Sequence, residues 1–173
     1  MLLNGKRLTL RKSIDADLDF LYSVASDKEI WTFSEEVETG DKLRCILVDR
    51  IHSNDSHNFV IQLNDDKQTS IGTMNIWVYH KKHRIWEISY AIFPAYRNKG
   101  YCIEALHILM NFAFYELNAH KVVGTCNEYN IGSSAVMEKI GMTKEAIFRE
   151  RLYWNNQWTD QFYYGILEHE YKN

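Results

Sequence analysis

The sequence predicts an α/β (α+β) chain built around a mixed sheet. Between residues 85 and 140 a strand, an amphipathic helix, a second strand and a second helix alternate, which is typical of parallel strands joined by a helix. Further strand-like segments before and after this run add antiparallel strands. The chain is most simply one domain, residues 1–173, because its single proline, Pro94, and the lack of any Ser/Gly-rich stretch leave no obvious linker.

The first half of the chain reads as a strand, two helices and three strands. Residues 6–11 form the first strand, and Asp15 or Asp17 caps a helix with Leu18, Leu21 and Ala25 on one face. The elements expected next are a helix over about 40–52 and strands over 58–63, 70–79 and 85–93.

The second half continues with a long helix over about 99–117, which places apolar side chains at helical spacing against the sheet. The remaining elements expected are a strand at 121–126, a helix at 131–140, and strands near 143–153 and 158–168.

The loop between strand 85–93 and the long helix carries Arg97, Lys99 and Gly100. The first turn of a helix has unpaired N–H groups and the positive end of the macrodipole, so cations and a glycine placed there suit a polyanion. A glycine also lets the backbone approach a ligand closely. The sequence contains neither G-x-G-x-x-G nor G-x-x-x-x-G-K-[ST], so neither common nucleotide fingerprint is present.

The loop Arg97-Asn98-Lys99-Gly100-Tyr101-Cys102 resembles the Q/R-x-x-G-x-G/A loop with which the GNAT superfamily of N-acetyltransferases binds the pyrophosphate of acetyl-CoA. Downstream, Asn130-Ile131-Gly132-Ser133 and Met137-Glu138-Lys139-Ile140-Gly141-Met142 resemble the N-x-x-S and E-K-x-G-F signature of its RimJ/RimL-like branch, named for ribosomal-protein N-terminal acetyltransferases. The resemblance spans nearly the whole chain and departs from the pattern at Asn98, Cys102 and Met142.

The resemblance implies a GNAT fold. This fold has a mixed central sheet of about seven strands, flanked by about four helices, with the cofactor wedged where strands four and five splay apart. It also implies an acetyl-CoA-dependent N-acetyltransferase in which a primary amine attacks the thioester directly in a ternary complex. Backbone amides near Ile92 and Phe93 would then bind the pantetheine arm and polarise the thioester carbonyl. The cofactor-binding residues expected are Ile92, Phe93, Arg97, Asn98, Lys99, Gly100, Tyr101, Cys102, Asn130 and Ser133.

An amine is mostly protonated at neutral pH, so the reaction needs a base. Glu87 is the first choice, because a carboxylate in a largely apolar strand has a raised pKa and many GNAT enzymes use a glutamate on this strand. The alternative is that Glu87 only forms an ion pair with a cation such as Arg84 or His83.

The acid that protonates the departing thiolate is harder to place. A tyrosine often does this in the superfamily, but Met137 stands at the matching position. Ser133 is the nearest substitute, as in some members of the RimJ/RimL-like branch, and Tyr153 and Ser134 are further candidates. A glutamate used as base in that branch would fall at Leu152, which cannot take a proton.

Two residues near the cofactor have alternative interpretations. Asn130 is a preferred helix N-cap, and its amide could also hold the pantetheine arm or a water. Cys102 lies at a helix start, where the pKa of a thiol falls, yet we expect a small residue tolerated beside the cofactor rather than an acyl carrier.

Composition narrows the function classes. A net charge of −3 and a pI of about 6.2 argue against a nucleic-acid binder, and the basic run from His80 to Arg84 is expected to be a solvated hairpin turn. The sequence shows no signal peptide, membrane span, disulfide framework or H-E-x-x-H motif, so we expect a cytoplasmic protein with no metal.

The acceptor is not written in the sequence. A protein N-terminus, a polyamine, an amino acid and an antibiotic amine remain open, as do a monomer and a homodimer. The residues Trp31, Phe33, Tyr153, Trp154 and Trp158 lie in segments that border the acceptor cleft in GNAT folds, and packing in a core or interface explains most of them equally well. Next to that cleft, Glu35, Glu36 and Glu38 could attract a cationic amine, although a solvated loop is the more common origin of such charges. Two other functions stay possible: an acyl-CoA sensor without turnover, and a ribosome-associated factor that binds RNA through residues 80–84.

Overall fold

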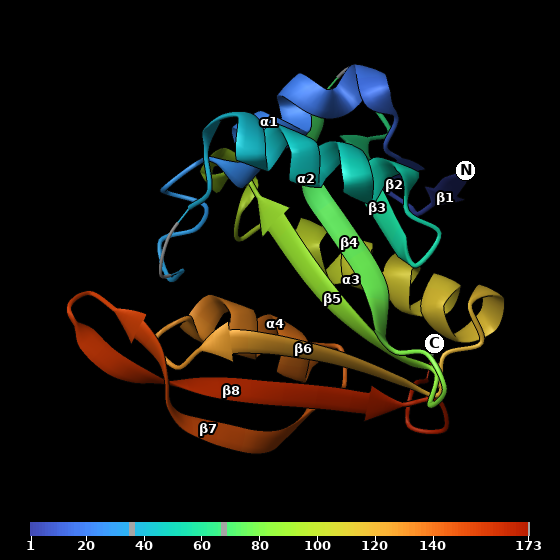
Figure 1. The fold of residues 1–173 in the computed structure, drawn as a ribbon. Helices are drawn as coiled ribbons and strands as arrows, with labels where there is room; N and C mark the ends of the chain where they lie inside the picture. Colours follow the sequence, from blue (N-terminus) through green and yellow to red (C-terminus); the bar gives the residue numbers. More distant parts are fainter. Residues whose placement is uncertain (35–36, 67–68, 173) are drawn as a thin grey trace.

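The computed structural model describes residues 1–34, 37–66 and 69–172. Its centre is an eight-stranded sheet with the order β1-β2-β3-β4-β5-β6-β8-β7 (Figure 1). The strands are β1 (Leu2–Asn4), β2 (Leu8–Lys12), β3 (Ser56–Leu63), β4 (Ser70–His80), β5 (Ile85–Ile92), β6 (Lys121–Asn127), β7 (Thr143–Trp154) and β8 (Gln157–Leu167). Within the described part of the chain, β5 and β6 run parallel and the other neighbours are antiparallel.

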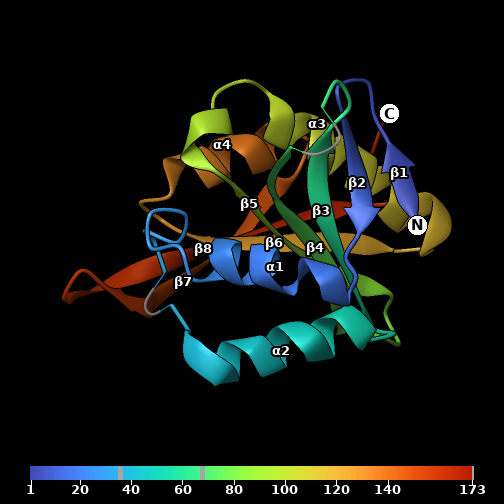
Figure 2. The same cartoon turned by 90° about the horizontal axis from the view of Figure 1, so that it is seen from above.

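Four helices cover the two faces of this sheet. The helices α1 (Leu18–Ala25) and α2 (Gly40–His52) lie on one face, and α3 (Tyr101–Asn111) and α4 (Ile131–Lys139) lie on the other (Figures 1 and 2). The main core fills the space between α3, α4 and the sheet, where Leu106, Leu109 and Met110 are fully buried. The expected α+β architecture of a mixed sheet with about four helices is confirmed.

Two elements differ from the expectation. The sheet has eight strands instead of about seven, because β1 forms a three-residue strand on the edge of β2, too short to show an alternating pattern. The long helix ends at Asn111 and continues as a π-helical turn over Phe112–Glu116, which the apolar spacing alone does not distinguish from an α-helix.

The parallel strands β5 and β6 separate after a short contact. Their register pairs are Ile85 with Lys121, Trp86 with Val122 and Glu87 with Val123. Both strands continue past these pairs, β5 as far as Ile92 and β6 as far as Asn127. The expected splay between these central strands is therefore confirmed, with its closed end at Glu87.

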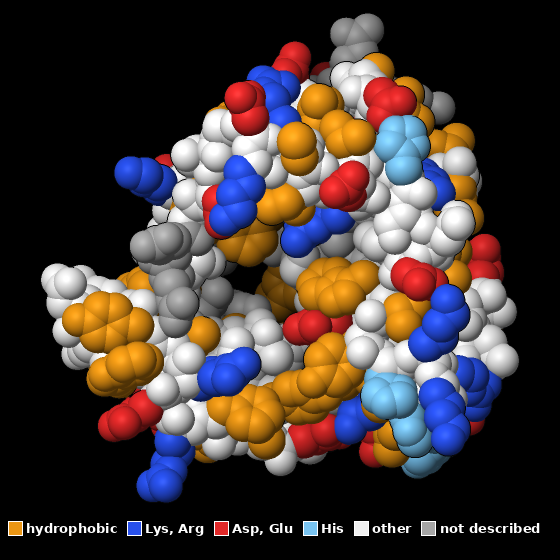
Figure 3. Space-filling view, viewed as in Figure 1, with side chains coloured by type: hydrophobic (Ala, Val, Ile, Leu, Met, Phe, Trp, Pro, Cys, Tyr) orange, Lys and Arg blue, Asp and Glu red, His pale blue; other side chains and the backbone are white. Residues whose placement is uncertain are grey.

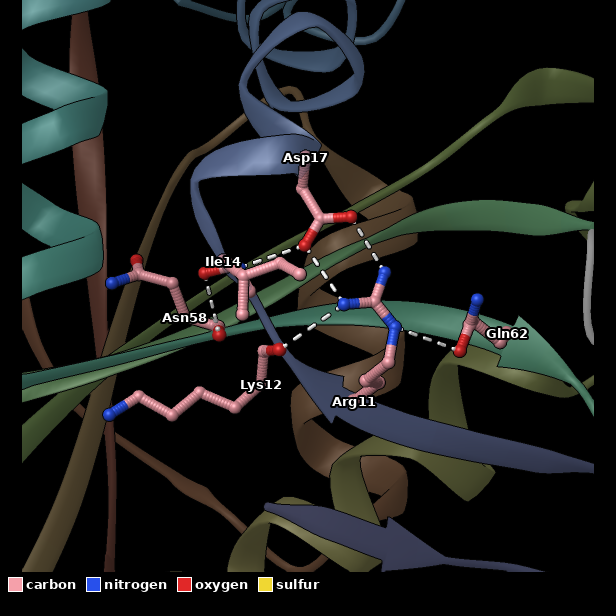
Figure 4. A network of polar contacts seen from close by, with 7 residues as sticks. Arg11, Lys12, Ile14, Asp17, Asn58 and Gln62 are labelled. Atoms are coloured by element: carbon pink, nitrogen blue, oxygen red, sulfur yellow. Dashed lines mark hydrogen bonds and ion pairs between the residues drawn. The ribbon is translucent and has the colours of Figure 1, made fainter.

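Asp17 does not use its carboxylate to cap α1. The carboxylate instead accepts hydrogen bonds from the Arg11 guanidinium at 2.7 and 2.9 Å and from the Ile14 N–H at 2.8 Å (Figure 4). Burial alone would raise the pKa of Asp17, but these hydrogen bonds outweigh it and hold the pKa below its usual range. The pair fixes the chain between β2 and α1.

The last two strands form a long hairpin. Asn155 and Asn156, both with φ near +50 to +60°, make its two-residue turn, as asparagines do in type I′ turns. The hairpin β7–β8 projects beside the splayed strands (Figure 1). Near its tip, Trp154 contacts Thr32 and Phe33 of the segment that follows α1.

Candidate active site

The splay between β5 and β6 opens into a cavity of about 1220 Å³. Both strands, the start of α3, the start of α4 and residues 29–34 line it. In the space-filling view a hollow separates the part of the molecule that carries α1 and α2 from the part that carries β6, β7 and β8 (Figure 3). Hydrophobic side chains gather at the rim of this hollow. The volume exceeds the roughly 300–1,000 Å³ of most small-molecule sites, so an extended cofactor and a second substrate can share it.

The basic loop enters the cavity at the start of α3. Gly100 is the N-cap residue with φ +77°, a conformation that L side chains rarely adopt. Arg97 donates from Nε to the Ile92 carbonyl at 3.1 Å, and Lys99 donates to the Ala95 carbonyl at 3.0 Å. Both cations therefore also stabilise the loop itself. The first turn of α3, which has unpaired N–H groups and lies at the positive end of the helix dipole, lines the cavity from Gly100 to Ile103.

A second layer of contacts supports this loop from Arg7, the residue just before β2. Arg7 donates to the Glu104 carboxylate at 2.7 Å and to the Lys99 carbonyl at 2.9 Å, and its guanidinium lies 4.7 Å from the Tyr101 ring centroid. Burial would raise the pKa of Glu104, but the hydrogen bonds from Arg7 lower it further than burial raises it. The carboxylate therefore stays charged and holds the first turn of α3 against the sheet.

The backbone amides of Ile92 and Phe93 point in different directions. The Phe93 N–H donates to the Ile71 carbonyl of β4 at 3.0 Å, so the sheet already uses it. Because alternate N–H groups of a strand point to opposite sides, the Ile92 and Tyr90 amides point toward the splay. Of the two amides expected at the thioester, the structure therefore brings only that of Ile92 to the cavity.

Glu87 lies at the closed end of the splay and lines the cavity. It is partly buried, and burial raises the pKa of its carboxyl, while a hydrogen bond from the Trp77 side chain on β4 partly offsets the increase. The cation offered as an alternative partner, Arg84, contacts Asn118 and Glu168 instead.

Tyr90, for which the sequence pattern alone predicts no role, crosses the cavity from β5 to α4. Its hydroxyl lies 2.8 Å from the Ser133 hydroxyl and 3.3 Å from the Ser133 carbonyl oxygen. Burial strongly raises the pKa of this phenol, and the hydrogen bond with Ser133 only partly opposes the rise. Period two places Tyr90 on the face opposite Glu87, so the two side chains approach the cofactor space from opposite faces of the sheet.

The N-terminus of α4 presents Ser133 to the cavity. Asn130 is its N-cap, and its side-chain oxygen accepts from the Ser133 N–H at 3.1 Å, as expected. Met137 is 1% exposed and packs with its sulfur against Gly124 of β6. The position that often carries a tyrosine thus helps to fill the core.

Two cysteines line the cavity beside these groups. Burial raises the pKa of Cys102 to about 12, the opposite of the decrease that its place at a helix start suggests, because the partly buried side chain packs against the apolar core. Burial also raises the pKa of Cys126, whose sulfur lies 3.4 Å from the Ser134 hydroxyl. Neither thiol has the character of an acyl carrier.

The side of the cavity where the acceptor is expected is aromatic. Trp31, Phe33 and Tyr153 line the cavity, whereas Trp158 is 62% exposed and packs on Tyr153 from outside the cavity lining. Leu152 also lines it. Of the acidic residues expected nearby, Glu35 and Glu36 lie outside the described residues, and Glu38 forms an ion pair with Lys42.

Other expectations concern metal, membrane and nucleic acid. His80 and His83 stand three residues apart with ring centroids 4.2 Å apart, but the described residues contain no group of three or more His, Cys, Asp or Glu that could hold a metal ion. Residues 81–84 form the exposed turn between β4 and β5, as expected. Over the same described ranges, each helix is too short or too polar to cross a bilayer.

The comparisons with known proteins all indicate the same family. A family model described as an acetyltransferase (GNAT) domain matches residues 7–143. The uncharacterised N-acetyltransferase YnaD of Bacillus subtilis is 32% identical, covering 99% of both chains, and spermidine N(1)-acetyltransferase of Vibrio cholerae is 26% identical, covering 98% of both.

Solved structures agree over nearly the full length. A GNAT-family acetyltransferase from Bacillus anthracis superposes with a TM-score of 0.84 at 31% identity, covering 98% of this chain and 100% of that one. Spermidine N-acetyltransferase from Vibrio cholerae, in complex with CoA and spermine, gives a TM-score of 0.87 at 25% identity over the same shares. The chain belongs to the GNAT acetyltransferase family and is an acetyl-CoA-dependent N-acetyltransferase.

Proposed function

We propose that this enzyme acetylates a small polycationic amine of the polyamine class. The observation that carries the proposal is the acceptor side of the cavity, where Glu29 and Glu87 stand among the aromatic rings of Trp31, Phe33 and Trp77. Carboxylates attract an ammonium group, and aromatic faces bind alkyl-ammonium chains through cation–π contacts. The Vibrio cholerae relative, a spermidine acetyltransferase with a solved complex with CoA and spermine, supports the same class.

Several finer assignments belong to this proposal. The N-x-x-S and E-K-x-G signatures support membership of the RimJ/RimL-like branch, and the whole chain, residues 1–173, would act as one domain. Its three free cysteines suit a reducing compartment such as the cytoplasm.

The donor would thread the splay between β5 and β6. Its diphosphate would lie on the loop from Arg97 to Cys102 at the start of α3, and the Ile92 N–H, which points into the gap, would bind the pantetheine arm or the thioester carbonyl. The cavity-lining residues assigned to the cofactor are Ile92, Arg97, Asn98, Gly100, Tyr101, Cys102, Asn130 and Ser133. Lys99 is assigned to it as well, from the same loop but outside that lining, and Phe93 is left to the sheet.

Glu87 would act as the general base, directly or through water. It lies at the closed end of the splay, and a raised pKa brings a carboxyl closer to the pH at which it can accept a proton from an ammonium group. The neutral amine then attacks the thioester carbon, and the tetrahedral intermediate expels the thiolate. Proximity of the two bound reactants supplies much of the rate.

Ser133 would act as the acid for the departing thiolate by relaying to the sulfur the proton that the attacking nitrogen loses as the amide forms, so that no serine alkoxide is left behind. When Tyr90 donates to the Ser133 oxygen, the Ser133 proton is free to point at the sulfur. Tyr90 keeps its own proton, because burial raises its pKa, and so acts as a fixed donor that positions Ser133. Tyr153 lies farther out, at the aromatic mouth of the cavity, and is the second choice for this acid.

An acceptor screen tests the proposed function. Purified enzyme is mixed with acetyl-CoA and, in separate reactions, spermidine, spermine, single amino acids and a short peptide with a free N-terminus, and release of free thiol is followed. We expect release that depends on spermidine or spermine and is at least tenfold faster than with the peptide. Release with the peptide alone would favour the protein N-terminus, and tight acetyl-CoA binding without release would favour a sensor.

A further inference from the structure

We propose that Trp154, together with Asn127, is a specificity-determining clasp that holds residues 27–34 across the open side of the cavity and so sets the width of the amine entrance. We call these two residues the clasp. The inference rests on the proposed function, because it concerns how the acceptor side selects its amine. Nothing in the roles given above to Glu87, Ser133 or Tyr90 requires it.

The N-terminal part of the 27–34 segment is held by contacts with α1. The Trp31 indole donates from Nε1 to the Val24 carbonyl at 2.9 Å, and the Trp31 N–H donates to the Asp27 carbonyl at 3.1 Å. Asp27 in turn accepts from the backbone of Glu29 and Ile30. This end of the segment therefore moves with the half of the molecule that contains β1 to β5.

The C-terminal end of the 27–34 segment is held by β6 and β7, which belong to the other half of the sheet. Trp154 of β7 donates from Nε1 to the Thr32 carbonyl at 2.6 Å, and its ring centroid lies 5.6 Å from that of Phe33. Asn127 at the end of β6 donates from Nδ2 to the Phe33 carbonyl at 3.4 Å. Two consecutive carbonyls of the segment thus receive donors from strands that lie about one hundred residues further along the chain.

The clasp is itself held in place. Asn127 is 4% exposed, donates to the Thr159 hydroxyl at 3.2 Å, and accepts from the Tyr129 N–H at 3.0 Å. The Tyr129 ring lies 5.4 Å from the Trp154 ring. The side chains of Trp154 and Asn127 are therefore both held in position by their neighbours, and a selective site requires side chains that are held in this way.

The position of the clasp allows it to control the width of the amine entrance. Among the described residues, three β5–β6 register pairs join the two halves of the sheet at the closed end of the splay. The 27–34 segment joins the halves at the open end. Residues 29–34 of this segment line the cavity. Loosening the clasp would displace them and widen the amine entrance, while the loop from Arg97 to Cys102, which has its own supports from Arg7 and Glu104, would stay in place.

The test is Trp154→Phe, which keeps an aromatic ring but removes the indole donor. The matched control is Trp158→Phe, since Trp158 lies on the same hairpin, is mostly exposed and is outside the lining of the cavity. We expect the KM for spermidine to rise at least fivefold in Trp154→Phe, with the KM for acetyl-CoA within twofold of wild type. The preference for spermidine over a bulkier peptide amine should fall. The control should leave all three values unchanged.

A readout that needs no turnover accompanies the kinetics. Hydrogen exchange measured by mass spectrometry should show faster exchange of peptides covering residues 28–34 in Trp154→Phe than in the control. The proposal would be overturned if Trp154→Phe and Trp158→Phe exchanged equally fast, or if Trp154→Phe raised the KM for spermidine and the KM for acetyl-CoA by the same factor. If no amine supported turnover, the proposed function would fail, and the exchange measurement would still decide for or against the clasp.

Discussion

The carboxylate of Glu87 lies where the two parallel strands part, with the Trp77 indole as its hydrogen-bond partner. Because burial raises its pKa, the fraction of enzyme with an ionised base falls as the pH decreases through that raised value. The rate with acetyl-CoA and an amine should therefore decline on the acidic side at a higher pH than an ordinary glutamate would give.

Glu87→Gln should lower kcat by about 10²-fold or more, because the amide cannot accept the proton. The KM for acetyl-CoA should change little. The acidic limb of the pH–rate profile should also disappear from the residual activity. Glu116→Gln is the control, since Glu116 is exposed in the π-helical turn. Full activity of Glu87→Gln at neutral pH would show that another group is the base.

Tyr90→Phe removes one hydroxyl and retains the buried ring. If Tyr90 positions Ser133, we expect kcat to fall about tenfold with the shape of the pH profile unchanged, because this phenol does not titrate in the working range. Ser133→Ala and the double variant complete a thermodynamic cycle. Additive losses in that cycle would contradict the coupling, and Tyr115→Phe, at a 70% exposed position, serves as the control.

Among the elements, α4 is short and depends on its cap. Asn130→Ala should destabilise the protein by about 1 kcal/mol, the usual cost of losing an N-cap, and should lower kcat because the Ser133 N–H loses its partner. Asn130→Asp keeps an acceptor at the cap and should restore the melting temperature. If the alanine and aspartate variants melted alike, the cap would not be what fixes the start of α4.

The strand β5 shows what a sequence pattern could and could not predict. Alternation places Glu87 and Tyr90 on opposite faces, so the strand and its candidate base were predictable. The direction of each N–H was not, because it depends on which residue of β4 lies opposite, and the bond from Phe93 to Ile71 removes one expected amide from the cavity. The switch of Asp17 from helix cap to partner of Arg11 has the same origin in a long-range contact.

For the whole molecule, the main features were predictable because they follow from local signals. The loop at Gly100, the cap at Asn130 and the alternation of strands and helices are each written in a few neighbouring residues. The clasp was not predictable, since Trp154 and Thr32 are separated by 122 positions and no local pattern joins them. The pairing of Tyr90 with Ser133 is hidden in the same way.

The free energy of unfolding should depend on pH through a few groups whose pKa is shifted in a known direction. Burial and the Lys12 charge lower the pKa of His57, whose Nδ1 is buried with no hydrogen-bond partner among the described residues. The folded state therefore binds fewer protons than the unfolded state, and stability should fall as the pH drops below about 6.5. The lowered pKa values of Asp17 and Glu104 should add a second loss below about 4. The raised pKa of Glu87 has the opposite sign, and it adds stability as the pH falls from that raised value to about 4.5.

Melting temperatures at pH 7.5 and 5.5 test the first of these losses. The wild type should melt lower at pH 5.5, and His57→Gln should show a smaller decrease because it cannot be protonated. His169→Gln, at an exposed position, should behave like wild type. Equal decreases in all three proteins would assign the acid sensitivity to other groups.

The central claim is that the backbone at the start of α3 binds the diphosphate of acetyl-CoA, and a calorimetric titration of acetyl-CoA tests it most directly. Gly100→Ala adds a Cβ at φ +77°, and Gly40→Ala adds the same strain at φ +71° at the start of α2, where nothing lies within 4 Å. The account predicts one saturable site, a Kd at least tenfold weaker in Gly100→Ala, and an unchanged Kd in Gly40→Ala. Binding that is equal in all three proteins, or no binding by wild type, would contradict it.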